Sequence, residues 1–382
     1  MVTLYDVARH AGVSTATVSR VVHGQDRVRD STRARVLRVI DQLGYVPDGA
    51  AQSLSRRRKN VIGLVCVERQ SPRQQYDIES MSLLFYDEIL RGVEARIRDH
   101  NWSLLISYLR EAATDPDLPR LLSLSGQVDG MLIGEGVVPS EFLARLAKRL
   151  PVVVVAGNPD ERAADVVMAD NRSGSAALVS HLIEVHGRRR LYHVDGPPSA
   201  PDAKERRIAL AELVAANPQC QLVGSSQGSF TVHSGEEAGA QLLAACGEQL
   251  PDAVVCANDL MAIGVLRAFG RAGVRVPEQV AVVGFDDIFP ASLCVPPLTT
   301  VHQPMRLLGE RACTRLLDRI ARPSMTPKVE LLPAELVLRS SCGCPPGTAT
   351  RQPVPALGAS RSAPGPAAPP RRGRRKTPAP AS

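Results

Sequence analysis

The chain has 382 residues, of which 44% are hydrophobic, and a net charge of +7. This length and apolar content suffice for more than one domain with a sizeable core. No apolar run approaches the roughly 18 residues of a membrane span, and the polar N-terminus is unlike a secretory signal. We therefore expect a cytoplasmic protein with no membrane partner.

The charge is unevenly distributed along the chain. Residues 1–60 carry a net charge of +6 and residues 343–382 carry +7, which leaves −6 for residues 61–342. A basic N-terminal end on an acidic body suits an electrostatic search of DNA by one end of the molecule.

The first 22 residues have the pattern of two short helices joined by a tight turn. Thr3 is placed to cap the first helix, and Asp6 three residues later can close a capping box. Gly12 stands where a helix C-terminus needs a residue that tolerates positive φ. The expected apolar face of this helix consists of Leu4, Val7, Ala8 and Ala11.

The second predicted helix presents a polar face suited to the major groove of DNA. Ser14 can cap this helix, which leaves its first backbone N–H groups free for a phosphate. Arg20 faces outward and can donate two hydrogen bonds to guanine, worth roughly 1–3 kcal/mol of base discrimination. The face expected to pack inward consists of Val18, Val21 and Val22. On these residues alone, a helical hairpin with a solvated polar face is an equally good interpretation.

A third helix and a small-residue stretch follow. Asp30 or Ser31 can cap this helix, and Gly44 ends it. Its expected apolar face consists of Val36, Leu37, Ile40 and Leu43. The chain then breaks at Pro47, and small residues lead to the basic run that ends at Lys59.

Together these segments resemble the head of the lactose-repressor (LacI/GalR) family of bacterial transcription regulators. The matching segments are 2–8, 11–14, 17–22 and 44–47. The resemblance implies a hinge helix over 48–55 that folds on operator DNA and places Leu54 in the minor groove, where an inserted apolar side chain kinks the duplex. The alternative for Leu54 is a linker residue that packs on the next domain. The residues expected to contact DNA are Tyr5, Ser14, Thr15, Ala16, Thr17, Ser19, Arg20, His23, Arg29 and Leu54.

From residue 61 the pattern changes to short apolar runs that alternate with helical segments, which predicts parallel sheets covered by helices on both faces. Strands are predicted at 61–67, 103–107, 130–133, 152–155, 191–194, 253–257 and 280–285. Helices are predicted at 86–100, 140–150, 174–185, 203–216, 234–245 and 260–272. Two such series suggest two lobes, with a ligand at the carboxyl ends of the strands.

The same family resemblance extends over residues 61–343, with its strongest matches at 257–264, 282–287 and 297–301. It implies a two-lobed core like that of periplasmic binding proteins, with three chain crossings between the lobes and an effector, expected to be a sugar or sugar derivative, in the cleft. The residues assigned to effector binding are Phe85, Arg206, Phe230, Asn258, Asp286 and Gln303.

Alternatives stay open for four of these residues. Asn258 and Asp286 could be helix or turn caps, and Phe230 could be a core residue. Gln303 could equally serve packing at the crossing between the lobes. Residues 156–158 are Ala-Gly-Asn where the family often has an acidic effector ligand, and residues 68–81 are extra, so the effector is not identified.

The C-terminal end suggests neither a cofactor nor a tetramer. Residues 345–382 are rich in Pro, Ala and Arg, which is typical of disorder. Nothing there matches a leucine-heptad tetramerisation helix, so we expect a homodimer. Cys342 and Cys344 are the only close cysteine pair, and no histidine lies near them in sequence, so we expect no metal and no cofactor.

Two other classes of protein compete with a DNA-binding regulator. Residues 224–228 match the G-x-S-x-G pattern of hydrolases, but residues 229–232 separate them from the next helical pattern, where a nucleophile elbow needs a helix at once. A transport binding protein would share the two lobes but has no DNA-binding head. We therefore do not expect an enzyme, although activation and corepression stay open beside repression.

The sequence thus predicts four regions. They are a helix-turn-helix domain (1–47), a hinge helix and linker (48–60), a two-lobed α/β core with parallel sheets for effector binding and dimerisation (61–343), and a disordered tail (344–382). The expected partners are double-stranded operator DNA, a small-molecule effector and a second copy of the chain.

Overall fold

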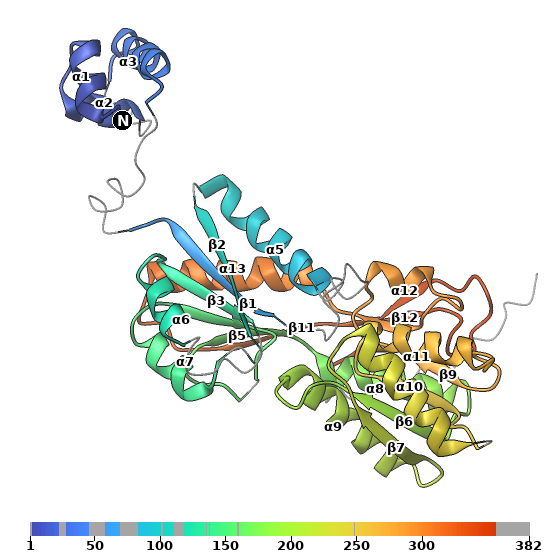
Figure 1. Cartoon of the computed structure of the whole chain (residues 1–382). Coiled ribbons are helices and arrows are strands. Elements are labelled where there is room, and N and C mark those ends of the chain that lie inside the picture. Colours follow the sequence, from blue (N-terminus) through green and yellow to red (C-terminus); the bar gives the residue numbers. More distant parts are fainter. Residues whose placement is uncertain are drawn as a thin grey trace, which may run out of the picture.

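The computed structural model describes residues 2–22, 28–45, 58–68, 83–100, 102–110, 118–134, 136, 138–158, 160–247 and 249–356. Three helices form an N-terminal head, and two α/β lobes form the body (Figure 1). Among the residues described, no helix combines the length and hydropathy that a membrane span requires.

The head contains α1 (Leu4–Ala11), α2 (Thr15–Val22) and α3 (Asp30–Leu43). The predicted capping box of α1 is confirmed, because Thr3 N donates to Asp6 Oδ2 at 2.9 Å and Asp6 N donates to Thr3 Oγ1 at 3.3 Å. Gly12 ends α1 with φ +60°. The three helices enclose a core made of Val7, Ala8, Ala11, Val18, Val21, Val28, Val36 and Val39.

The inward face of α3 differs from the prediction. Val36 and Val39 are buried, whereas Leu37 is 50% exposed. Each helical residue turns about 100° from the previous one, so Leu37 lies off the stripe that Val36 and Val39 define. The helix also begins at Asp30 with Arg29 as its N-cap residue, and no side chain among the described residues caps it, so the predicted cap by Asp30 or Ser31 is wrong.

The N-terminal lobe is built on a parallel six-stranded sheet with the order β11-β5-β4-β3-β1-β2. Its strands are β1 (Val61–Glu68), β2 (Ser103–Arg110), β3 (Gly130–Gly134), β4 (Val152–Val155), β5 (Asp165–Ala169) and β11 (Val329–Leu332). Every residue of β3 and β4 is buried, as their unbroken apolar runs predict. Strand β5 is also wholly buried, but the sequence analysis did not predict it.

Helices cover both faces of this sheet (Figure 1). One face carries α5 (Leu83–Ile97), continued by the 3-10 turn η2 (Arg98–His100), together with α13 (Met305–Ala321). The other carries α6 (Leu118–Ser125) and α7 (Ser140–Ala147). Helices α5 and α13 touch backbone to backbone, since a Cβ added at Gly92 would lie 2.0 Å from the carbonyl oxygen of Arg306.

The C-terminal lobe has a parallel four-stranded sheet with the order β7-β6-β8-β9. Its strands are β6 (Arg190–Asp195), β7 (Gln221–Gln227), β8 (Ala253–Cys256) and β9 (Ala281–Val283). The sequence did not predict β7, because this edge strand is polar and mostly solvent-facing. The helices of the lobe are α8 (Asn171–Glu184), α9 (Pro201–Ala216), α10 (Val232–Cys246), α11 (Asp259–Arg271) and α12 (Phe289–Leu293).

The chain passes between the lobes three times, in agreement with the predicted two-lobed core. It crosses from β5 to α8, from β10 (Thr300–His302) to α13, and from β11 to β12 (Glu335–Leu338). The first and third crossings are hydrogen-bonded to each other, because Asp170 N donates to Leu332 O at 2.8 Å. These two crossings therefore run side by side.

The predicted start of the disordered tail at residue 344 is too early. Residues 350–353 form β13 (Thr350–Pro353), which pairs antiparallel with β12 in a three-stranded sheet ordered β10-β12-β13. Arg351 also forms an ion pair with Asp287 at 2.7 Å. Composition missed this strand because backbone pairing and the ion pairs of Arg351 with Asp287 and Glu335 hold it, without large apolar side chains in the strand. Residues 357–382 lie outside the described residues.

Two truncations separate the strand from the rest of the tail. Deleting residues 345–382 removes β13 and the Arg351–Asp287 pair. We expect the melting temperature to fall by roughly 2–4 °C, the shift for about 1 kcal/mol lost from a domain of the size of the C-terminal lobe. Deleting only 357–382 should leave it unchanged. Equal melting temperatures for both truncations, measured by calorimetry, would contradict a stabilising role for β13.

Candidate DNA interface and interlobe ligand site

The polar side of α2 is turned to solvent, as contact with DNA requires. Ser14, Ala16 and Arg20 are exposed, while Val18 and Val21 are buried against the other two helices. Three other residues expected to contact DNA are half-buried, namely Thr15, Thr17 and Ser19. Two more, Tyr5 and Arg29, lie outside α2 and are exposed. His23, Leu54 and the predicted hinge helix over 48–55 lie outside the described residues.

The start of α2 is capped as predicted. Thr17 N donates to Ser14 Oγ at 3.2 Å, and the hydroxyls of Ser14 and Thr17 lie 2.9 Å apart. The N-terminal N–H groups of a helix point along its axis and attract anions, so this end of α2 is suited to a phosphate.

In the C-terminal lobe, a buried guanidinium organises the polar groups at the carboxyl ends of the strands. Arg206, on α9, is only 4% exposed. Its Nε donates to Asn171 Oδ1 at 2.9 Å, its Nη1 donates to Ala257 O at 2.5 Å, and its guanidinium carbon lies 3.8 Å from the centre of the Phe285 ring. Two carboxylates, Asp202 and Asp286, each approach it at 3.5 Å.

Asp286 and Gln303 meet at the crossing between the lobes. Asp286 follows β9 with φ +123°, and its Oδ1 accepts a hydrogen bond from Gln303 Nε2 at 2.6 Å. Gln303 follows β10, directly before the chain crosses to α13, and is 2% exposed. Within the described part of the chain, Gln303 Oε1 has no hydrogen-bond partner. The packing alternative for Gln303 is thus observed, together with one acceptor that a ligand could use.

Asn258 and Phe230 form the other side of this cluster. Asn258 Oδ1 accepts from Met261 N at 3.0 Å, so the capping alternative is observed at the start of α11. Its Nδ2 donates to Phe230 O at 3.3 Å. Phe230 has φ +61° and is 9% exposed, and its ring packs against Gly196, where an added Cβ would lie 2.4 Å from Cε1. Asn258 directly follows Ala257, whose carbonyl accepts from Arg206, so five of the six predicted effector residues lie in two adjoining groups.

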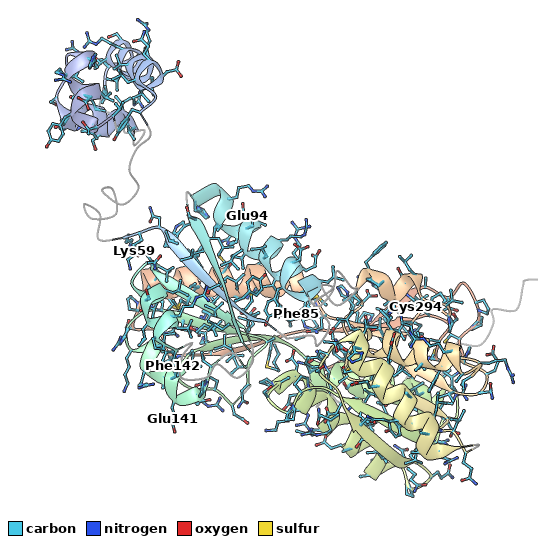
Figure 2. The ribbon with its side chains drawn as sticks, in the orientation of Figure 1. Lys59, Phe85, Glu94, Glu141, Phe142 and Cys294 are labelled. Atoms are coloured by element: carbon cyan, nitrogen blue, oxygen red, sulfur yellow. The ribbon has the colours of Figure 1, made fainter. Side chains whose placement is uncertain are left out.

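Phe85, the sixth predicted residue, comes from the N-terminal lobe. It lies on the end of α5 next to the C-terminal lobe (Figure 2). Its ring meets the Tyr86 ring edge to face, with centroids 5.3 Å apart. This places Phe85 at the lobe boundary without a direct contact to the Arg206 network among the interactions described.

Two cavities open at the boundary between the lobes, both within the range of roughly 300–1,000 Å³ typical of small-molecule sites. One of about 440 Å³ is lined by Asp286 and Gln303 on one side and by Leu84 and Asp87 of α5 on the other. Another of about 340 Å³ is lined by residues that include Asn158 and Ser199. Arg206, Asn258 and Phe230 line neither of them.

The sequence analysis missed Asp259, which anchors the loop that carries Asp286. Asp259 is fully buried, and its carboxyl accepts from Thr300 Oγ1 at 2.6 Å and from Ile288 N at 3.0 Å. Burial, and next the negative charge of Asp286, raise the pKa of Asp259 well above its ordinary value. Asp259 directly follows Asn258 in one of the segments that best match the family, and this position could have indicated its role.

The hydrolase-like residues do not form a nucleophile elbow. Ser226, the central serine of the pattern, lies within β7, and its hydroxyl pairs with that of Tyr192. Helix α10 begins only at Val232. A strand followed at once by a helix is the geometry that the elbow requires, and the chain does not have it here.

Comparison with known proteins identifies the family. Residues 3–48 match the model of bacterial regulatory proteins of the lacI family, and residues 179–342 match a periplasmic binding protein-like domain. The transcriptional repressor PurR of Mannheimia succiniciproducens is 32% identical over 347 residues, which cover 89% of this chain and 98% of PurR. The chain belongs to the lacI family of bacterial regulatory proteins.

Other lacI-family members agree with this assignment. The repressor CytR of Escherichia coli K12 is 31% identical, over 89% of this chain and 96% of CytR. The structure of the lac repressor dimer bound to operator and the anti-inducer ONPF superposes with a TM-score of 0.78 at 28% identity, covering 89% of this chain and 99% of that one. A complex of the regulator CelR with cellobiose gives 0.64 at 32% identity, covering 89% and 100%.

The anchoring role of Asp259 can be tested by its removal. In Asp259→Ala the Ile288 N–H and the Thr300 hydroxyl lose their acceptor, and each unsatisfied group costs about 1–3 kcal/mol. We expect the free energy of unfolding, measured in urea, to fall by roughly 2–6 kcal/mol. Asp318→Ala, which breaks an exposed pair on α13, should change it by less than about 1 kcal/mol. Similar losses in both variants would contradict the anchor.

Proposed function

We propose that this lacI-family protein is a transcriptional repressor that binds operator DNA as a homodimer, and that a sugar or sugar derivative bound between the lobes controls its operator affinity. The observation that carries the proposal is the junction of Asp286, Gln303 and Arg206. There a carboxylate, a guanidinium and a buried acceptor that has no partner among the described residues meet at a chain crossing between the lobes.

The DNA-binding part of the proposal is supported by the exposed face of α2. Arg20 reads a guanine, while Ser14 and the start of α2 hold a phosphate. The relatives PurR and CytR are both transcriptional repressors, and the lac repressor structure is a dimer bound to operator. The further residues that we propose to contact DNA are Tyr5, Thr15, Ala16, Thr17, Ser19, His23, Arg29 and Leu54.

The effector part is supported by the chemistry of the cleft. Hydroxyl groups of a sugar both donate and accept hydrogen bonds, so they suit Asp286 as acceptor, Gln303 Oε1 as acceptor and Arg206 as donor. Phe85 and Phe230 supply apolar rings beside this network, and Asn258 supplies an amide. The related regulator CelR is complexed with cellobiose, which favours a saccharide.

The position of Gln303 supports control of the head by the cleft. This residue stands at the crossing from β10 to α13, and Asp286 beside it is bridged to His302 of β10. A ligand that binds both side chains changes the hinge between the lobes. It shifts the operator affinity only as far as it binds one lobe arrangement more tightly than the other. Binding rather than catalysis is therefore the proposed activity.

The role of Arg20 is tested by comparing two arginine variants. An operator is first selected from random duplexes with the wild-type protein. Arg20→Ala should raise its Kd roughly 5–150-fold, equivalent to about 1–3 kcal/mol, and relax the preference at one base pair. Arg38→Ala, which removes an exposed charge from α3, should weaken all duplexes alike. An unchanged sequence preference in Arg20→Ala would refute its role as a base reader.

The effector role of Asp286 is tested after a thermal-shift screen of sugars. For a sugar that stabilises the wild-type protein, Asp286→Ala should raise the ligand Kd roughly 10–150-fold, the loss expected for a hydrogen bond to a charged group. Operator affinity without the sugar should stay the same, and Asp318→Ala should respond like wild type. A normal gel-shift response in Asp286→Ala would exclude Asp286 from the site.

A further inference from the structure

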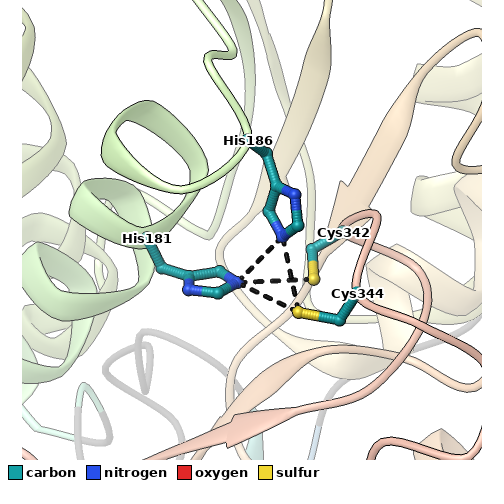
Figure 3. Close-up of side chains that lie close together, drawn as sticks. All are labelled: His181, His186, Cys342 and Cys344. Atoms are coloured by element: carbon teal, nitrogen blue, oxygen red, sulfur yellow. Dashed lines mark hydrogen bonds between the residues drawn. The ribbon is translucent and has the colours of Figure 1, made fainter.

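A second cluster of chemically active side chains lies at the end of α8 opposite the Arg206 network. His181 is in the last turn of α8, and His186 follows the helix end. Cys342 and Cys344 follow β12, far from the two histidines in sequence (Figure 3). All four side chains point toward one another, and their four ligand atoms lie within 4.8 Å.

The contacts converge on single atoms. His181 Nε2 lies 3.1 Å from His186 Nε2, 3.6 Å from Cys342 Sγ and 3.5 Å from Cys344 Sγ. His186 Nε2 lies 3.4 Å from Cys344 Sγ. An imidazole nitrogen has either one proton or one lone pair, so it makes one good hydrogen bond. Hydrogen bonding therefore does not account for three partners at His181 Nε2.

A tetrahedral metal ion does account for the observed distances. With metal–sulfur bonds near 2.3 Å and metal–nitrogen bonds near 2.05 Å, a tetrahedron separates two nitrogens by about 3.3 Å and a nitrogen and a sulfur by about 3.6 Å. The nitrogen pair lies at 3.1 Å, three of the four nitrogen–sulfur pairs lie at 3.4–3.6 Å, and all four ligand atoms lie within 4.8 Å of one another. Two thiolates and two imidazoles form a common ligand set for structural zinc.

We propose that His181, His186, Cys342 and Cys344 bind one Zn²⁺ ion that fastens the C-terminal segment to α8. The expectation from sequence of no metal at Cys342 and Cys344 rested on the absence of a second cysteine pair and of a nearby histidine. The fold corrects that premise, since it brings His181 to Cys342 across 161 positions of sequence.

The surroundings of the cluster suit such a site. Thr299 Oγ1 lies 3.1 Å from Cys342 Sγ and 2.9 Å from Arg339 O, so its one proton is within reach of the sulfur, as an outer hydrogen bond to a metal-bound thiolate requires. Gly343 has φ +116°, a conformation that side chains rarely adopt, and it lets both cysteines turn to the same side. Cys342 is fully buried, whereas Cys344 and His186 are half-buried, which leaves an entry path for the ion.

The ion would connect the C-terminal end of α8 to the segment between β12 and β13. Helix α8 starts beside the Arg206 network, where Asn171 accepts from Arg206 Nε. The cysteines stand between β12 and β13, and Arg351 of β13 pairs with Asp287, next to Asp286. Zinc therefore holds the distal end of the same lobe whose other end carries the proposed effector site.

The direct test is metal analysis of the full-length chain, purified under reducing conditions without chelator. We expect about one zinc per chain, and in metal-stripped protein we expect Co²⁺ to give the absorption of tetrahedral thiolate coordination, saturating near one equivalent and bleached by Zn²⁺. Chelation should lower the melting temperature by several degrees.

Two variants and one control make the test specific. Cys344→Ser and His186→Ala change half-buried ligands and should lose the stoichiometric zinc and the cobalt absorption. Cys220→Ser changes a half-buried thiol outside the cluster and should retain both. Wild-type protein that carries no zinc and gives no cobalt absorption would overturn the proposal, as would a Cys342–Cys344 disulfide that persists under reductant. The cobalt titration of wild-type protein decides the matter even if a variant fails to fold.

Discussion

The buried guanidinium of Arg206 is the constraint around which the cleft of the C-terminal lobe is built. A charged group that is 4% exposed needs compensation, and Asn171, Ala257 O, Asp202 and Asp286 provide it. These partners come from α8, the end of β8, α9 and the loop after β9, so one side chain ties together the elements that border the cleft. Both carboxylates stand at 3.5 Å from the guanidinium, which is longer than a direct charge-assisted hydrogen bond.

The same network touches the hinge between the lobes. Asp286 binds Gln303, and Gln303 stands where the chain leaves the C-terminal lobe for α13. Helix α13 in turn packs backbone to backbone on α5, which carries Phe85. A ligand at this junction is therefore in a position to favour one lobe arrangement. Couplings between two sites of this kind amount to about 1–3 kcal/mol, which suffices to change the occupancy of an operator.

Sequence reasoning succeeded where local chemistry decides the structure. The Thr3 capping box, the Gly12 helix end and the wholly buried strands of the N-terminal lobe follow from neighbouring residues, and the structure has them. Several of the errors concern long-range contacts. Strand β13 depends on pairing with β12, and the anchoring role of Asp259 depends on Thr300 and Ile288. The contact between His181 and Cys342 joins residues that are 161 positions apart in sequence. Leu37 is a different case, because the predicted apolar face of α3 included this residue although it lies outside the buried stripe of the helix.

The central claim is that a ligand in the interlobe site and operator DNA at the head affect each other's binding. Thermodynamic linkage makes this reciprocal, so calorimetric titration of a stabilising sugar into the free protein and into its operator complex tests it most directly. The account predicts two ligand Kd values that differ by roughly 5–150-fold, with the same ratio between the operator Kd values measured with and without the sugar. Identical ligand affinities for the free and the operator-bound protein would contradict it.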